Sequence, residues 1–151
     1  MNRRRFACLL ALVVLLVPVF SGCTSIPRES ADDDVHAKRF STRPDKANIY
    51  LYRDELLGFA IAMTVAINGR KAGQTVGQTF LRWEVDPGTH EIASYTEDIA
   101  TLKLNAEAGK SYYVWQEVKL GFWSAQSMLH EVDESQGRQG VVKCRLVKSD
   151  L

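Results

Sequence analysis

The sequence has few of the residues from which active sites and metal centres are most often built. Its 151 residues include only three histidines and three cysteines. It lacks H-E-x-x-H, paired C-x-x-C, a glycine-rich phosphate loop and G-x-S-x-G, whose spacings arrange metal ligands, phosphate-binding amides or a nucleophile. We therefore predict no catalytic residues, no metal site and no bound cofactor.

Clustered charge of one sign is also lacking. The 19 basic and 18 acidic residues give a formal net charge of +1, and they are scattered along the chain. Arg3, Arg4 and Arg5 stand apart at the start, and without them 16 basic residues face 18 acidic ones. Because nucleic-acid binding needs a clustered basic face, we expect no nucleic-acid partner.

What the sequence does have is an N-terminal segment with the three parts of an export signal. A basic stretch at 2–5 is followed by an apolar run at 6–20 and by two small residues, Ser21 and Gly22. The run is shorter than the roughly 20 residues that span a bilayer as a helix, and Pro18 interrupts it. Residues 1–22 are therefore predicted to be a signal peptide. The Arg3-Arg4-Arg5-Phe6 cluster loosely resembles a twin-arginine signal, so the export route stays open.

The end of this segment carries a candidate lipid-attachment site. Val19-Phe20-Ser21-Gly22-Cys23-Thr24 resembles the bacterial lipobox, although Phe20 replaces the usual leucine. The resemblance implies cleavage before Cys23 and a covalent lipid such as palmitate on its thiol. Each buried acyl methylene contributes about 0.8 kcal/mol, so a multiply acylated cysteine holds a chain on the membrane. Similarity to lipoprotein sorting in enteric bacteria implies, through Thr24, an outer-membrane location facing the periplasm. The alternative is an ordinary secretory signal that contains a cysteine by chance.

The rest of the chain divides into a polar segment and an alternating one. Residues 23–46 include Asp32-Asp33-Asp34 and few bulky apolar side chains, which predicts a lipid anchor and a flexible tether. Residues 47–151 form the predicted domain, with Cys144 as an inert buried thiol if Cys23 carries lipid.

Short runs with a two-residue apolar period, separated by turn residues, predict strands in this domain. The predicted pieces are 49–53, 61–67 with the Asn68-Gly69 hairpin and its return to 76, 81–85, 90–95, 100–106, 112–118 and 126–132. The expected fold is mainly β, an antiparallel β-sandwich or small barrel. The tail at 133–147 favours a short C-terminal helix, which Ser135 could cap, while 141–147 could instead be an edge strand.

The order of four of these pieces resembles the bacterial lipoproteins grouped as domain-of-unknown-function family 2846. The pieces are Ile49-Tyr50-Leu51-Tyr52-Arg53, Val65-Ala66-Ile67-Asn68-Gly69, Pro87-Gly88-Thr89-His90-Glu91-Ile92 and Ala108-Gly109-Lys110-Ser111-Tyr112-Tyr113-Val114. The hairpin followed by Pro-Gly-x-His is also similar to the small β-sandwich modules called PEGA domains. Neither resemblance implies an activity, so no functional residue is carried over.

The best candidate for recognition is the segment around Phe122 and Trp123, two large aromatics that follow Gly121. On a loop they could bind a protein or a sugar, and the alternative is that they close one end of the sandwich. The sequence thus predicts a lipid-anchored periplasmic interaction or structural module, with an envelope protein or glycan as partner. One alternative is an envelope enzyme with a dispersed site, which requires a polar cleft with His90 or His130 beside a carboxylate. Another is an inhibitor of an envelope protein, which requires an exposed inserting loop.

Overall fold

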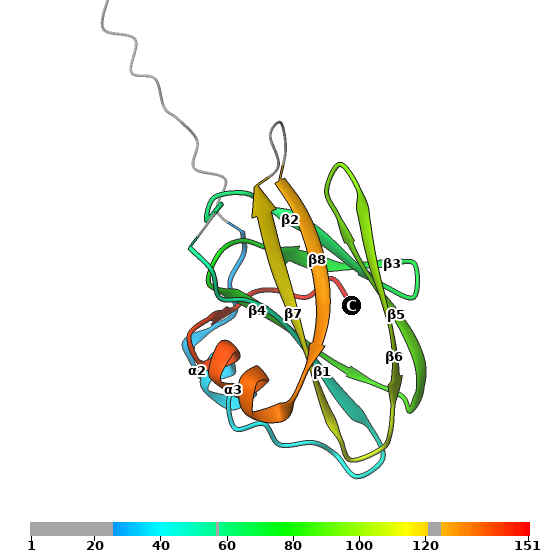
Figure 1. The fold of residues 1–151 in the computed structure, drawn as a ribbon. Coiled ribbons are helices and arrows are strands. Elements are labelled where there is room, and N and C mark those ends of the chain that lie inside the picture. Colours follow the sequence, from blue (N-terminus) through cyan, green and yellow to red (C-terminus); the bar gives the residue numbers. More distant parts are fainter. Residues whose placement is uncertain (1–25, 57, 121–124) are drawn as a thin grey trace, which may run out of the picture.

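The computed structural model describes residues 26–56, 58–120 and 125–151, and within these ranges the protein is a sandwich of two β-sheets (Figure 1). One sheet has the strand order β8-β7-β1-β4-β9 and the other the order β3-β2-β5-β6. The elements are α2 (Ala31–Ala37), β1 (Ala47–Arg53), β2 (Met63–Ile67), β3 (Arg70–Thr75), β4 (Thr79–Val85), β5 (Gly88–Tyr95), β6 (Ile99–Ala106), β7 (Ser111–Leu120), β8 (Ala125–Val132), α3 (Glu134–Val142) and β9 (Arg145–Leu146). The predicted β-sandwich is confirmed, and the strands of the described ranges form two open sheets rather than a closed barrel.

The hairpin between β2 and β3 is also confirmed. Asn68 and Gly69 both have positive φ, 51° and 75°, as the two central residues of a tight hairpin turn require. Ile67 then pairs with Arg70 across the turn.

Apolar side chains that alternate along the strands fill the space between the sheets. Ile49 and Leu51 from β1 meet Leu81 and Trp83 from β4, all of them buried. The opposite sheet adds a matching set, Val65, Ile67, Ile92 and Leu104. Removing this surface from water is the main stabilising contribution to the fold.

Two strand pairs differ from the predicted antiparallel pattern. β1 pairs with β7 in parallel, with Leu51 opposite Val114, and β4 pairs in parallel with β9. The chain leaves β1, builds the whole second sheet with β4, and only then returns as β7. Such distant pairing leaves no trace in local periodicity.

The prediction of a flexible tether at 23–46 is wrong for residues 26–46, which are folded against the sandwich. Ser30 caps α2 by accepting a hydrogen bond from the Asp33 amide at 3.1 Å. Asp34 is buried, and its carboxylate accepts from the Leu146 amide and from Lys38 Nζ, both at 2.7 Å. The acidic triplet therefore serves the start of a helix and a contact with β9, which the composition alone did not reveal.

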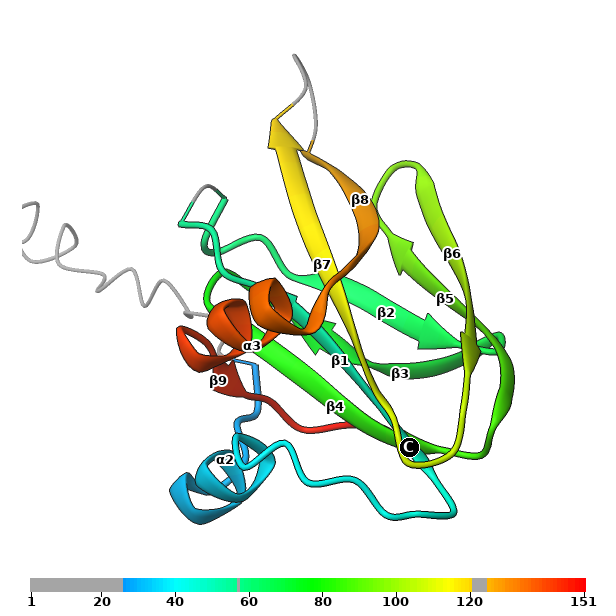
Figure 2. The ribbon, with the colours of Figure 1, turned by 60° about the horizontal axis from the view of Figure 1, so that its bottom comes forward.

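Both alternatives for the C-terminal tail are correct in part. A helix, α3, is followed by the two-residue edge strand β9. Asp133 caps the helix, accepting from the Gln136 amide at 2.9 Å, rather than Ser135. Helices α2 and α3 cover the outer face of the five-stranded sheet (Figure 2), where they enclose a second cluster that includes Tyr50, Tyr52 and Tyr113.

Candidate interaction surface

Five exposed apolar side chains lie toward one end of the sandwich, which we call the apolar end. It comprises Leu56, Phe59, Ile61, Tyr95 and Ile99, with exposed fractions between 39% and 69%. The first three belong to the chain that follows β1, and Tyr95 and Ile99 end β5 and begin β6. Both segments lie in the upper half of the molecule in Figures 1 and 2, on opposite sides of β7 and β8. Exposed patches of this kind mark interaction sites more often than isolated apolar residues do.

The chain after β1 is held in place by a buried arginine. Arg53 points between the sheets, in phase with Ile49 and Leu51, and has no exposed surface. Its guanidinium donates to the carbonyl oxygen of Ile61 at 2.7 Å and to that of Gly58. Burial lowers the pKa of Arg53 from its ordinary value. Charge-assisted hydrogen bonds to backbone carbonyls thus fix the segment that presents Phe59 and Ile61.

Gly77, in the turn between β3 and β4, allows the same segment to pack closely. A Cβ at this position would lie only 2.9 Å from Phe59 Cα and from the Glu55 carbonyl oxygen. The Gly77 amide also donates to the Phe59 carbonyl oxygen at 3.0 Å. Phe59 is therefore exposed through its side chain while its backbone is fixed.

Glu55 is the second charged group beneath the apolar end. Its carboxylate accepts the amide hydrogen of Val118, beyond the point where β1 stops pairing with β7. Burial raises the pKa of Glu55, against the lowering effect of that hydrogen bond.

A buried polar chain ties the two sheets together below the apolar end. Gln116 of β7 accepts a hydrogen bond from Thr75 Oγ1 and donates to Ser94 Oγ, at 2.5 and 2.7 Å. Ser127 Oγ donates to the same Ser94 Oγ at 2.7 Å. All four side chains are buried and hydrogen-bonded, so this hydrogen-bond network fixes the relative position of β3, β5, β7 and β8. Arg53 and Gln116 were not singled out from the sequence, although both are polar residues at inward positions of otherwise apolar strands.

Of the predicted site residues, Phe122, Trp123 and Cys23 lie outside the described residues. The interpretation of Phe122 and Trp123 as a binding loop stays a prediction.

The two histidines of the domain have partners. His90 Nδ1 lies 2.9 Å from Asn68 Nδ2 and its Nε2 lies 2.8 Å from the Asp86 carbonyl oxygen, which fits a neutral ring that donates through Nε2. His130 Nε2 lies 2.9 Å from Glu117 Oε2, and its ring packs on Trp115 with centroids 5.3 Å apart. His130 thus lies beside a carboxylate, as the enzyme alternative requires, on the outer face of β7 and β8.

Cys144 is buried, as predicted. Burial raises the pKa of its thiol from 9.0 to about 12, so the reactive thiolate is scarce at neutral pH.

Among the described residues, no three His, Cys, Asp or Glu side chains are grouped so that they could hold a metal ion. No helix in the described part of the chain is long and apolar enough to cross a membrane.

Fold and surface together define a small β-sandwich with one apolar end and two helices on one face. The chain belongs to the family described as proteins of unknown function (DUF2846), whose model matches residues 43–128. This confirms the resemblance inferred from the four strand-and-turn pieces. The chain is also similar to an uncharacterized protein of Haemophilus influenzae (strain ATCC 51907 / DSM 11121 / KW20 / Rd), with 27% identity over 142 residues, 92% of this chain and 84% of that protein. No solved structure matches.

Proposed function

We propose that the protein is a lipid-anchored periplasmic interaction module, held to the outer membrane through Cys23, that binds an envelope protein with its apolar end. The observation that carries the proposal is the exposure of Leu56, Phe59 and Ile61 on a segment held by Arg53, toward the same end of the sandwich as Tyr95 and Ile99. Rigid apolar and aromatic side chains are effective anchors because little conformational entropy is lost when they bind.

The charges near the apolar end favour a protein partner over a lipid surface. Glu97 and Asp98 are exposed in the turn between Tyr95 and Ile99. Carboxylates at this position are repelled by anionic headgroups, whereas they can pair with basic residues at the rim of a protein interface.

Crosslinking in cells tests the surface. A photoreactive amino acid at Phe59 should give a reproducible adduct with an envelope protein. The matched control is the same amino acid at Glu107, an exposed position in the turn at the opposite end of the sandwich. An adduct that is equally strong at Glu107, or a Phe59 adduct that persists in an Ile61→Asp, Ile99→Asp variant, contradicts the proposal. A Phe59 adduct that contains a glycan instead of a protein contradicts the choice of partner.

Membrane fractionation tests the anchor. The Cys23→Ser chain should leave the membrane fraction or stay unprocessed, with the Cys144→Ser chain as the matched control. A Cys23→Ser chain of mature size that still fractionates with membranes contradicts lipid anchoring.

The envelope enzyme with a dispersed site is the alternative proposal, supported by the pairing of His130 with Glu117. Neither residue lines the pocket described below. The inhibitor role differs from the leading proposal only in its consequence for the partner, so crosslinking followed by an assay of the captured protein distinguishes the two.

A further inference from the structure

A pocket lies on the outer face of β4, well away from the apolar end. It has a volume of about 290 Å³. Three parts of the chain line it: α2 and the residues just before this helix, β4, and β9 and the residues just after this strand. Its lining residues are Glu29, Asp33, His36, Ala37, Arg82, Leu146, Val147 and Ser149. The pocket exists only because the segment before β1 is folded rather than a tether.

Arg82 supplies the positive charge of this pocket from the sheet side. Its side chain is half-buried, donates to Asn48 Oδ1 at 3.1 Å and is hydrogen-bonded to Tyr50, while its buried Nε atom has no partner within the described residues. Its charge acts on Tyr50, where it opposes the rise in pKa that burial causes.

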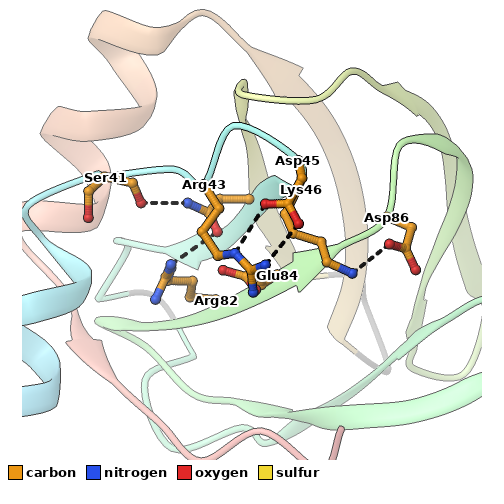
Figure 3. Close-up of polar contacts among 8 residues, drawn as sticks. Ser41, Arg43, Asp45, Lys46, Arg82, Glu84 and Asp86 are labelled. Atoms are coloured by element: carbon orange, nitrogen blue, oxygen red, sulfur yellow. Dashed lines mark hydrogen bonds and ion pairs between the residues drawn. The ribbon is translucent and has the colours of Figure 1, made fainter.

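Arg82 has no carboxylate partner among the described residues, in contrast to its neighbour Arg43 (Figure 3). Arg43 forms ion pairs with Asp45 at 2.8 Å and Glu84 at 3.4 Å. A half-buried guanidinium without a counterion is costly, and a planar carboxylate is the group that its geometry fits best.

Negative charge lies on the helix side of the same pocket. Glu29 and Asp33 contribute carboxylates to the lining there, together with the imidazole of His36. One oxygen of the Asp33 carboxylate accepts a hydrogen bond from Ser30 Oγ at 2.6 Å. Ala37, Leu146 and Val147 are the apolar residues of the lining. The lining therefore combines a cation, apolar side chains and carboxylates.

We propose that this pocket binds a small zwitterion of the amino-acid class, with its carboxylate on Arg82 and its ammonium group near Glu29 and Asp33. The volume admits a ligand with a short aliphatic side chain, which would lie on Leu146 and Val147. This site is independent of the apolar end and of the membrane anchor.

Titration of the isotope-labelled domain, residues 26–151 kept intact, with alanine as the probe tests the proposal. The backbone amides of Leu146, Val147 and Ser149 should shift in NMR spectra and saturate, and acetate or ethylammonium alone should bind at least about tenfold more weakly. Arg82→Gln keeps a donor for Asn48 but removes the charge, and should weaken alanine binding about tenfold or more. Arg43→Gln, which alters an arginine outside the pocket, is the matched control and should bind as the unchanged domain does.

Several results would overturn the assignment. They are the absence of saturable shifts with alanine, equal binding of acetate and alanine, or equal weakening by Arg43→Gln. If Arg82→Gln fails to fold, Glu29→Gln with Asp33→Asn replaces it, since that pair should remove the preference for alanine over acetate. A retained preference in that variant contradicts the role of the helix side.

Discussion

Gly140 of α3 lies directly against the ring of Tyr52 in β1, so closely that a Cβ on the glycine would overlap the ring. Gly137, one turn earlier, has the same relationship to Tyr113 of β7. The helix therefore packs on the sheet through its backbone, and the two tyrosine rings fill the space that side chains of α3 would otherwise occupy.

This contact predicts that Gly140→Ala destabilises the protein, even though alanine favours helices. The added methyl group must displace Tyr52 or lift α3 from the sheet, at a cost of about 1–3 kcal/mol. Urea unfolding followed by circular dichroism measures the change. Gln139→Ala, at the exposed neighbouring position, is the control and should change the free energy of unfolding by less than about 0.5 kcal/mol. Equal stability of the Gly140→Ala and Gln139→Ala proteins would contradict the packing.

The buried chain centred on Gln116 makes a second prediction. Gln116→Leu leaves Thr75 without its partner inside the core and leaves Ser94 bonded only to Ser127, so the free energy of unfolding should fall by about 1–3 kcal/mol. Gln126→Leu removes a hydrogen bond to Asp98 at the surface and should have little effect. The same urea unfolding experiment compares the two variants. A Gln116→Leu protein as stable as the Gln126→Leu control would show that the buried hydrogen bonds contribute nothing to the free energy of unfolding.

Arg53 should control the mobility of the apolar end. Arg53→Met removes the donors to the Gly58 and Ile61 carbonyl oxygens, so the amides of Phe59, Ile61 and Gly77 should exchange with solvent about tenfold faster or more. Hydrogen exchange followed by NMR gives these rates. Arg43→Met, which alters only exposed ion pairs, should leave them unchanged. Unchanged exchange in the Arg53→Met protein would mean that the segment is held by other contacts.

Stability should decrease at high pH because of Cys144 and Tyr52. Burial raises the pKa of Cys144 from 9.0 to about 12 and that of Tyr52 from 10.0 to about 12. The folded protein therefore keeps protons that the unfolded chain loses, and the free energy of unfolding falls as the pH rises from about 9 to 12. Urea unfolding at pH 8 and pH 10.5, with reductant present, measures the decline. Cys144→Ala should reduce the slope, and an identical slope in that variant would contradict the contribution of the thiol.

The strands were predictable because their evidence is local. Alternation at Leu81 and Trp83 and the Asn68-Gly69 turn each depend on a few consecutive residues. The parallel pairing of β1 with β7 could not be predicted in this way, since it joins residues more than 60 positions apart. Helix α2 was missed for a related reason: the contact of Asp34 with β9, which holds the helix on the sandwich, joins residues that are distant in the chain.

The candidate surfaces were less accessible to sequence reasoning than the fold. Ile61 was assigned to a strand by its alternation with Met63, but the structure leaves it exposed before β2 begins. Arg53 and Gln116 did carry a signal, because a polar residue at an inward position needs a buried partner. The pocket around Arg82 left no such signal, since it is assembled from three segments that are distant in the chain.

The pairing of the first described residues with the C-terminal segment has a mechanical consequence. The Glu29 amide donates to the Leu146 carbonyl oxygen at 3.1 Å and the Lys148 amide donates to that of Pro27 at 3.0 Å. In a chain anchored at Cys23, tension from the membrane would act first on these two hydrogen bonds. These two hydrogen bonds would break before the force reached β1. The contacts of β9 and α2 would then be lost first, while the apolar end kept its structure.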